Sequence, residues 1–180
     1  AENASAFGCD PKRIAIGGDS CGGNLAAVCA LASAREELPA LAAQLLVYPV
    51  VDDDITRPSF QTYGSQLILE TEDMAWYWNL YCASGPAREN WRARPIHAES
   101  FRSMPPAVIA IAEFDPLRSE VESYAEKLEQ NDVPVERISF EKLPHAALTI
   151  AAADSGVRQT IARMGNSLAQ LLASEATTAH

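Results

Sequence analysis

A serine in a glycine-rich turn is the first group in this sequence that could act as a nucleophile. Ser20 lies in the pattern Gly18-x-Ser20-x-Gly22, after an apolar run that ends at Gly18 and before a run rich in alanine and leucine. That order predicts a strand, a sharp turn and a helix, the arrangement called a nucleophile elbow. We expect a strained turn, with the glycines two residues on either side of Ser20 keeping the strand and the helix from colliding. The hydroxyl would then point out of the sheet toward a base.

An acid and a base follow the serine at the ends of later predicted strands. Asp115 comes after the apolar run at 107–112, and His145 comes after a run at 135–140 that alternates as an edge strand does. Because the carboxyl ends of parallel strands meet at one edge of a sheet, we expect Ser20, Asp115 and His145 to lie together. His145 would take the proton of the serine, and Asp115 would orient the imidazole ring. The backbone N–H of Cys21 would donate to an oxyanion.

Other acids compete for the role of Asp115. Asp52, Asp53 and Asp54 follow the second apolar run, so one of them could supply the acid from the end of the neighbouring strand. Asp19 lies beside the serine, but in an elbow its side chain would point elsewhere. The sequence favours Asp115 and leaves the three aspartates open as an alternative.

The remaining histidines are weaker candidates for the base. His97 precedes Asp115 in the chain, and we expect it to be solvent-exposed or structural. His180 is the terminal residue, where we expect disorder. The alternative for His145 is a loop histidine packed after Pro144, with no chemical role.

Strands and helices alternate along the predicted chain. We expect strands at 13–18, 42–47, 107–112 and 135–140, and helices at 21–37, 71–82, 117–130 and 148–174. This alternation predicts the α/β class, with right-handed crossovers and a mostly parallel sheet covered by helices on both faces. We expect one domain over 1–180, with an excursion at about 50–105 that carries the helix at 71–82. The segment 84–94 reads as a loop, and the aromatic stripe of the helix at 71–82 reads as core.

The composition narrows the possible partners. The 180-residue chain has a net charge of −10, so it offers no basic patch for nucleic-acid phosphates or for an anionic membrane surface. Its four cysteines form no C-x-x-C pair and its three histidines lie far apart, so we expect no metal site. The first residues do not read as a signal peptide, and no apolar run approaches the length of a membrane helix. A cytoplasmic setting is the expectation.

Several motifs together carry a resemblance to a known family. The block from Gly17 to Asn24 looks like GDSAGGN, and similar stretches stand at 10–11, 48–50, 104–107 and 112–118. In these motifs the sequence resembles the hormone-sensitive-lipase-like esterases, the bacterial family IV group of α/β-hydrolases, from about residue 3 to about residue 150. The resemblance implies an α/β-hydrolase fold. It also implies a serine esterase that cleaves short- to medium-chain carboxylic esters through an acyl-enzyme, with a small-molecule ester as partner and without a cofactor.

The sequence departs from that family in two places. It contains no HGGG-type loop, so we expect the N-terminal strands and part of the cap to be missing. His145 is followed by Ala146-Ala147, where the family usually has Gly-Phe. Without the preceding strands, the strand at 13–18 would have a bare apolar edge, which a homodimer or a complementing chain could cover.

With one oxyanion donor, we expect weak or no turnover from the isolated chain. A non-catalytic ligand-binding protein, or an inactive truncated member of the same fold, is the alternative function.

Overall fold

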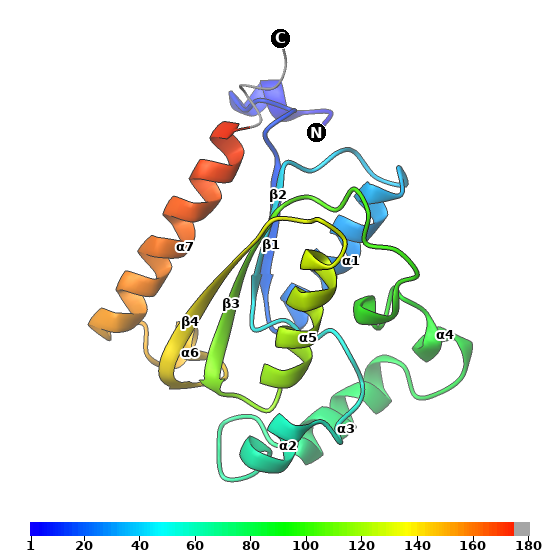
Figure 1. The fold of residues 1–180 in the computed structure, drawn as a ribbon, viewed down its shortest axis with the longest axis vertical. Helices are drawn as coiled ribbons and strands as arrows, with labels where there is room; N and C mark the ends of the chain where they lie inside the picture. The colour runs from blue at the N-terminus through cyan, green and yellow to red at the C-terminus, as the bar shows by residue number, and fades with distance from the viewer. Residues whose placement is uncertain (175–180) are drawn as a thin grey trace.

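Four strands form one parallel sheet in the order β1-β2-β3-β4, shown in Figure 1. The structure is a computed structural model that describes residues 1–174, so the expectation about His180 lies outside the described residues. The strands are β1 (Ala15–Asp19), β2 (Ala43–Val47), β3 (Ala107–Phe114) and β4 (Val135–Pro144). All four strands were predicted, and β3 and β4 run further toward their carboxyl ends than the apolar runs indicated.

Each strand's burial follows from its place in the sheet. β2 and β3 lie between two neighbours and are almost continuously buried, as expected for strands covered on both faces. β4 lies at one edge, and burial alternates there from Ile138 through Ser139 to Phe140. β1 lies at the other edge: in the described part of the chain it pairs with β2 alone, and Gly17 is exposed.

Helices cover both faces of the sheet. α1 (Cys21–Ala34) and α5 (Arg118–Glu129) lie on one face, and α7 (Ser155–Ser174) lies on the other, as Figure 1 shows. Alternate residues of β3 serve the two faces, because side chains of a strand point to opposite sides. Ala107 and Ile109 pack with α1 and α5, whereas Val108 and Ala110 pack with α7. The predicted α/β architecture is therefore confirmed.

The excursion at 50–105 holds α2 (Pro58–Tyr63), α3 (Thr71–Tyr81), α4 (Pro86–Glu89) and the 3₁₀ helix η2 (Pro95–His97). The short α4 lies within the segment predicted as a loop. Met74 and Trp78 of α3 are buried in the same apolar cluster as α1 and α5, whereas Tyr77 and Tyr81 are half exposed. The prediction that this aromatic stripe belongs to the core therefore holds for Met74 and Trp78, whereas Tyr77 and Tyr81 lie at the surface.

Two predicted helices end or break earlier than expected. α1 stops at Ala34, because Glu36 adopts a φ of +61° and the N–H of Glu37 turns back to the carbonyl of Ala32. The predicted helix at 148–174 is split into α6 (Ala147–Ile150) and α7. Asp154 starts α7, since its carboxylate accepts the N–H groups of the first turn.

A short 3₁₀ helix, η1 (Ala4–Phe7), precedes the sheet. Among the described residues, no helix combines the length and the apolar character needed to cross a bilayer.

Candidate active site

Ser20 sits in a strained turn between β1 and α1. Its backbone has φ +52° and ψ −119°, outside the regions that a residue with a side chain normally adopts. Two neighbouring backbone groups hold it there: its N–H donates to the carbonyl of Val47 at 2.9 Å, and its carbonyl accepts from Val50 at 3.1 Å. Ser20 occupies the N-cap position of α1, yet its hydroxyl makes no capping hydrogen bond. The hydroxyl is therefore available to another partner.

Close packing around the elbow explains two of the glycines near Ser20: Gly18 lies where β1 meets α1, and Gly23 lies where α1 meets Pro49, which follows β2. A Cβ on Gly18 would lie 2.2 Å from the carbonyl oxygen of Gly22, and a Cβ on Gly23 would lie 2.7 Å from the side chain of Pro49. Gly22 itself has room, because the nearest atom to an added Cβ is 4.0 Å away. The expectation that a small residue is required at Gly22 was wrong, and the steric requirement falls on Gly18 and Gly23.

The structure brings the three predicted residues together. The Oγ of Ser20 lies 2.9 Å from Nε2 of His145, and Nδ1 of His145 lies 2.7 Å from a carboxylate oxygen of Asp115. Because an ionised carboxylate can only accept, Nδ1 carries the hydrogen and Nε2 accepts from the serine hydroxyl. The second carboxylate oxygen of Asp115 accepts the N–H of Leu117 at 2.8 Å. The imidazole and the carboxylate are both buried, and Ser20 is partly exposed.

Asp115 and His145 come from the carboxyl ends of β3 and β4, next to each other in the sheet. Ala146, which stands where the resemblance led us to expect glycine, adopts a φ of +62°. That left-handed conformation favours glycine, so the alanine is strained, yet His145 still reaches its two partners.

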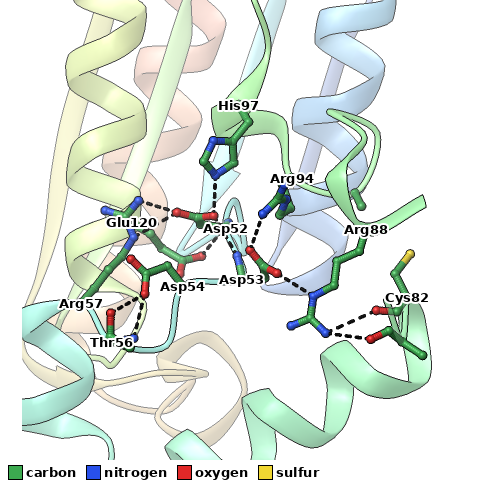
Figure 2. Close-up of polar contacts among 12 residues, drawn as sticks. Asp52, Asp53, Asp54, Thr56, Arg57, Cys82, Arg88, Arg94, His97 and Glu120 are labelled. Atoms are coloured by element: carbon green, nitrogen blue, oxygen red, sulfur yellow. Dashed lines mark hydrogen bonds and ion pairs between the residues drawn. The ribbon is translucent and has the colours of Figure 1, made fainter. Parts of the chain in front are cut away.

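The competing aspartates are engaged elsewhere, as Figure 2 shows. Asp52 binds Nε2 of His97 at 2.8 Å and also pairs with Arg57. Asp53 pairs with two arginines of the excursion, and Asp54 accepts from Thr56. The three aspartates lie at the end of β2, as predicted, but none of these contacts involves His145. His97 is 45% exposed in its side chain, in agreement with the expectation that it is exposed or structural.

The electrostatics of this network follow from burial and from the arginines. Burial alone would raise the pKa of Asp53, but hydrogen bonds from Arg94 and Arg88 outweigh it and lower that pKa. Glu120, on α5, is fully buried, and burial raises its pKa well above the ordinary value. One oxygen of Glu120 accepts the backbone N–H groups of Val51 and Asp52, at 2.8 and 3.3 Å.

Sequence reasoning missed two residues that support the site. Glu120 lies on the face of α5 that also carries the buried Tyr124 and Leu128, and this position on an apolar helix face was the signal that the sequence offered. Asn24, in the block after Ser20, donates to the carbonyls of Val50 and Ala93 at 2.9 Å. It thus ties the elbow helix to the excursion.

The backbone N–H of Cys21 belongs to the first turn of α1, so it has no acceptor within its own helix. The thiol of Cys21 is exposed. Within residues 1–174, no cluster of three or more histidine, cysteine or acidic side chains is arranged to hold a metal ion.

Residues 1–149 match a protein family described as alpha/beta hydrolase fold. The chain is 39% identical over 136 residues to an ethyl acetate hydrolase of Pseudomonas putida, a match that covers 75% of this chain and 43% of that protein. It is 38% identical over 151 residues to the carboxylic ester hydrolase LipN of Mycobacterium tuberculosis, covering 80% of this chain and 40% of that protein. A crystal structure of the esterase rPPE superposes with a TM-score of 0.89 and 34% identity, covering 95% of this chain and 55% of that one. The chain spans about half the length of these proteins.

Proposed function

Since this chain belongs to the alpha/beta hydrolase fold family, we propose that it carries the catalytic residues of a serine carboxylesterase. Ser20 is the nucleophile, His145 the base and Asp115 the orienting acid. The single observation that carries the proposal is the unbroken line of hydrogen bonds from Ser20 Oγ through the imidazole to Asp115, at 2.9 and 2.7 Å. Distances of this kind are what a nucleophile activated by an adjacent base requires.

The first half of the reaction forms an acyl-enzyme. Ser20 Oγ attacks the carbonyl carbon of the ester while Nε2 of His145 takes the hydroxyl proton. When the tetrahedral intermediate collapses, the carbon–oxygen bond to the alcohol breaks and His145 gives that proton to the leaving alcohol. In the second half, a water molecule attacks the acyl carbonyl carbon while Nε2 of His145 takes its proton. The bond between that carbon and Ser20 Oγ then breaks, and His145 returns the proton to the serine oxygen. The acid is released and the serine hydroxyl is restored.

Asp115 and Cys21 supply charge stabilisation in this scheme. The carboxylate of Asp115 keeps the hydrogen on Nδ1 and stabilises the imidazolium that forms during each proton transfer. The backbone N–H of Cys21 donates to the oxyanion, because it follows the nucleophile at the start of α1. The helix dipole adds to this effect, since the positive end of α1 lies at the reacting oxygen.

Short- to medium-chain carboxylic esters are the proposed substrates. The relatives named as an ethyl acetate hydrolase and a carboxylic ester hydrolase support this class. The partner is then a small molecule, and no metal or cofactor takes part in the proposed steps.

We also propose that the chain folds as one domain and that the free edge of β1 is covered by a second copy or by a complementing chain. The apolar cluster shared by the excursion, α1 and α5 supports a single domain. Among residues 1–174, β1 pairs with β2 alone, and this unpaired side of the strand supports the proposal of a covering partner. The four cysteines are free, which supports a reducing, cytoplasmic setting. The molar mass in solution, measured by light scattering, tests the dimer.

Labelling with a fluorophosphonate probe tests the proposed function directly. The probe phosphonylates an activated serine with loss of fluoride, so the reaction needs the nucleophile and its base but no particular ester. We expect labelling of the unaltered chain and of His97→Ala, and loss of labelling in Ser20→Ala and His145→Ala. Labelling that survives Ser20→Ala would remove Ser20 as the nucleophile. A folded chain that does not label at all would favour the non-catalytic alternative.

A further inference from the structure

Tyr48 occupies a strained and enclosed position beside the proposed base. It follows β2 directly, is 1% exposed and has a φ of +35°, a left-handed conformation that favours glycine. Its N–H donates to the carbonyl of Ala110 in β3 at 2.7 Å. It lies between Val47 and Val50, the two residues that hold the backbone of Ser20. Strained residues that their surroundings hold in place are concentrated at functional sites.

The side chain of Tyr48 contacts the base and the loop that carries it. The tyrosine and imidazole rings have centroids 4.7 Å apart and planes inclined by 57°. The tyrosine ring also contacts Phe140 of β4, with centroids 6.0 Å apart. Its hydroxyl oxygen accepts the backbone N–H of Leu148 in α6 at 3.4 Å. Burial raises the pKa of Tyr48 to about 12, so the phenol is neutral at physiological pH.

The two hydrogen bonds of His145 leave one motion of its ring weakly restrained. Both bonds lie near the imidazole plane, because ring nitrogens donate and accept in that plane. They fix the direction of Nε2 within the plane, but they resist tilting of the ring out of the plane only weakly. The inclined ring of Tyr48, in contact with the imidazole, resists that tilt.

We propose that Tyr48 is a positioning residue for the ester hydrolysis. Its ring holds the imidazole of His145 so that Nε2 stays at the hydroxyl of Ser20, and its hydroxyl anchors the start of α6. The inference rests on the proposed function, because it concerns the same proton transfer. Tyr48 acts through His145 and does not itself contact the reacting atoms. A displacement of about 1 Å at a reacting group can lower a rate about 10²-fold.

The test compares Tyr48→Leu with Tyr124→Leu. Tyr124 of α5 is also fully buried and also packs on a phenylalanine, Phe101, at 5.7 Å, but it lies in the apolar cluster on the other face of the sheet. Both variants lose a buried phenol ring, so a general loss of packing affects them alike. Tyr48→Phe retains the ring and removes the hydroxyl. Circular dichroism confirms that each variant is folded.

Two readouts are measured on the 180-residue chain. The first is the rate constant for fluorophosphonate labelling of Ser20, and the second is the far-downfield proton NMR resonance of the hydrogen on Nδ1 of His145. We expect Tyr48→Leu to label about 10²-fold more slowly and to broaden or lose that resonance. We expect Tyr124→Leu to retain both, and Tyr48→Phe to retain most of the rate because the ring contact remains.

The inference is overturned if Tyr48→Leu matches Tyr124→Leu in rate and resonance. If Tyr48→Leu does not fold, Tyr48→Met replaces it, since methionine fills the volume with a flexible chain rather than a flat ring. A folded, unaltered chain without Ser20-dependent labelling contradicts the proposed function instead. The resonance of His145 then decides the positioning role without any activity.

Discussion

The described residues contain two aspartate–histidine pairs that resemble each other in distance and differ in surroundings. Asp115 binds Nδ1 of His145 at 2.7 Å, and Asp52 binds Nε2 of His97 at 2.8 Å. Both aspartates are buried, with exposures of 1% and 2%. Distance and burial therefore do not separate the pair proposed to be reactive from the structural pair.

The other contacts of each pair make the difference. The carboxylate of Asp52 also pairs with Arg57, whose Nε lies 3.1 Å away, so its charge is already compensated (Figure 2). Within residues 1–174, the other hydrogen bond to the Asp115 carboxylate comes from the neutral N–H of Leu117. The remaining nitrogen of His145 faces the hydroxyl of Ser20. A carboxylate with no arginine beside it can stabilise an imidazolium that forms during a reaction, whereas one paired with arginine mainly holds structure together.

The largest difference should come from replacing each aspartate by asparagine. In Asp115→Asn the side-chain amide can donate to Nδ1 and favour the wrong tautomer of His145, so labelling of Ser20 should fall about 10⁴-fold. In Asp52→Asn the labelling rate should stay close to that of the unaltered chain. The free energy of unfolding should drop by about 2 kcal/mol, because Arg57 loses a charged acceptor. Labelling kinetics and urea unfolding measure the two effects, and equal loss of labelling in both variants would contradict the distinction.

Alanine substitutions at Gly18 and Gly22 test how tightly the turn around Ser20 is packed. In the described part of the chain, the pair formed by Asp52 and His97 has no such turn beside it. Gly18→Ala should lower the free energy of unfolding by about 3 kcal/mol and slow labelling, because its Cβ would meet a backbone oxygen at 2.2 Å. Gly22→Ala should raise that free energy by about 0.5 kcal/mol, since alanine favours a helix and nothing lies closer than 4.0 Å. Urea unfolding monitored by fluorescence gives both values. Similar losses in the two variants would show that the turn is tighter than described.

Near the pair formed by Asp52 and His97, the raised pKa of the buried Glu120 should make the free energy of unfolding depend on pH. Burial keeps its proton in the folded state at pH values where the unfolded carboxyl, with a pKa near 4.5, has lost it. The folded state then binds more protons, so this contribution to the free energy of unfolding decreases as pH rises above 4.5 and through the raised folded pKa. Asp52 and Arg57 face the same carboxyl and act on its pKa in opposite directions.

Glu120→Gln removes this titration and keeps an acceptor for the N–H groups of Val51 and Asp52. Its unfolding free energy should therefore change less with pH than that of the unaltered chain as the pH rises above 4.5. Glu120→Ala should lose stability at every pH, because both N–H groups lose their acceptor. Urea unfolding at several pH values measures the slopes, and parallel slopes for Glu120→Gln and the unaltered chain would refute the assignment.

The smallest expected effect concerns the alanine that follows each histidine. Ala146 has a φ of +62°, so Ala146→Gly should relieve strain and raise the free energy of unfolding by about 0.5 kcal/mol. Ala98 has a φ of −61°, so Ala98→Gly should lower it by a similar amount. Thermal unfolding compares the two variants. A loss of stability in both would indicate that the loop after His145 does not strain its alanine.

Much of the fold could be predicted, because it depends on local patterns. Continuous apolar runs marked the buried β2 and β3, and alternation marked β4 as an edge strand. The fold prediction is confirmed by the match over residues 1–149, and the resemblance to the esterase group by the ester-hydrolysing relatives. The errors came from side chains whose partners are not set by periodicity. Asp154 starts α7 within a predicted helix, and a Cβ added to Gly22 would meet nothing closer than 4.0 Å, although the position of Gly22 in the motif suggested a clash.

The sequence by itself determined the elbow around Ser20, the α/β order of elements and a short set of candidate acids and histidines. These follow from residues near one another in the chain, where spacing controls geometry. Only the tertiary structure decided which acid meets which histidine, since Asp115 and His145 are 30 residues apart and Asp52 and His97 are 45 apart. Sheet order and loop conformation set those contacts. The same reason explains why Tyr48 and Glu120, each joining segments distant in sequence, emerged only when the strands were placed side by side.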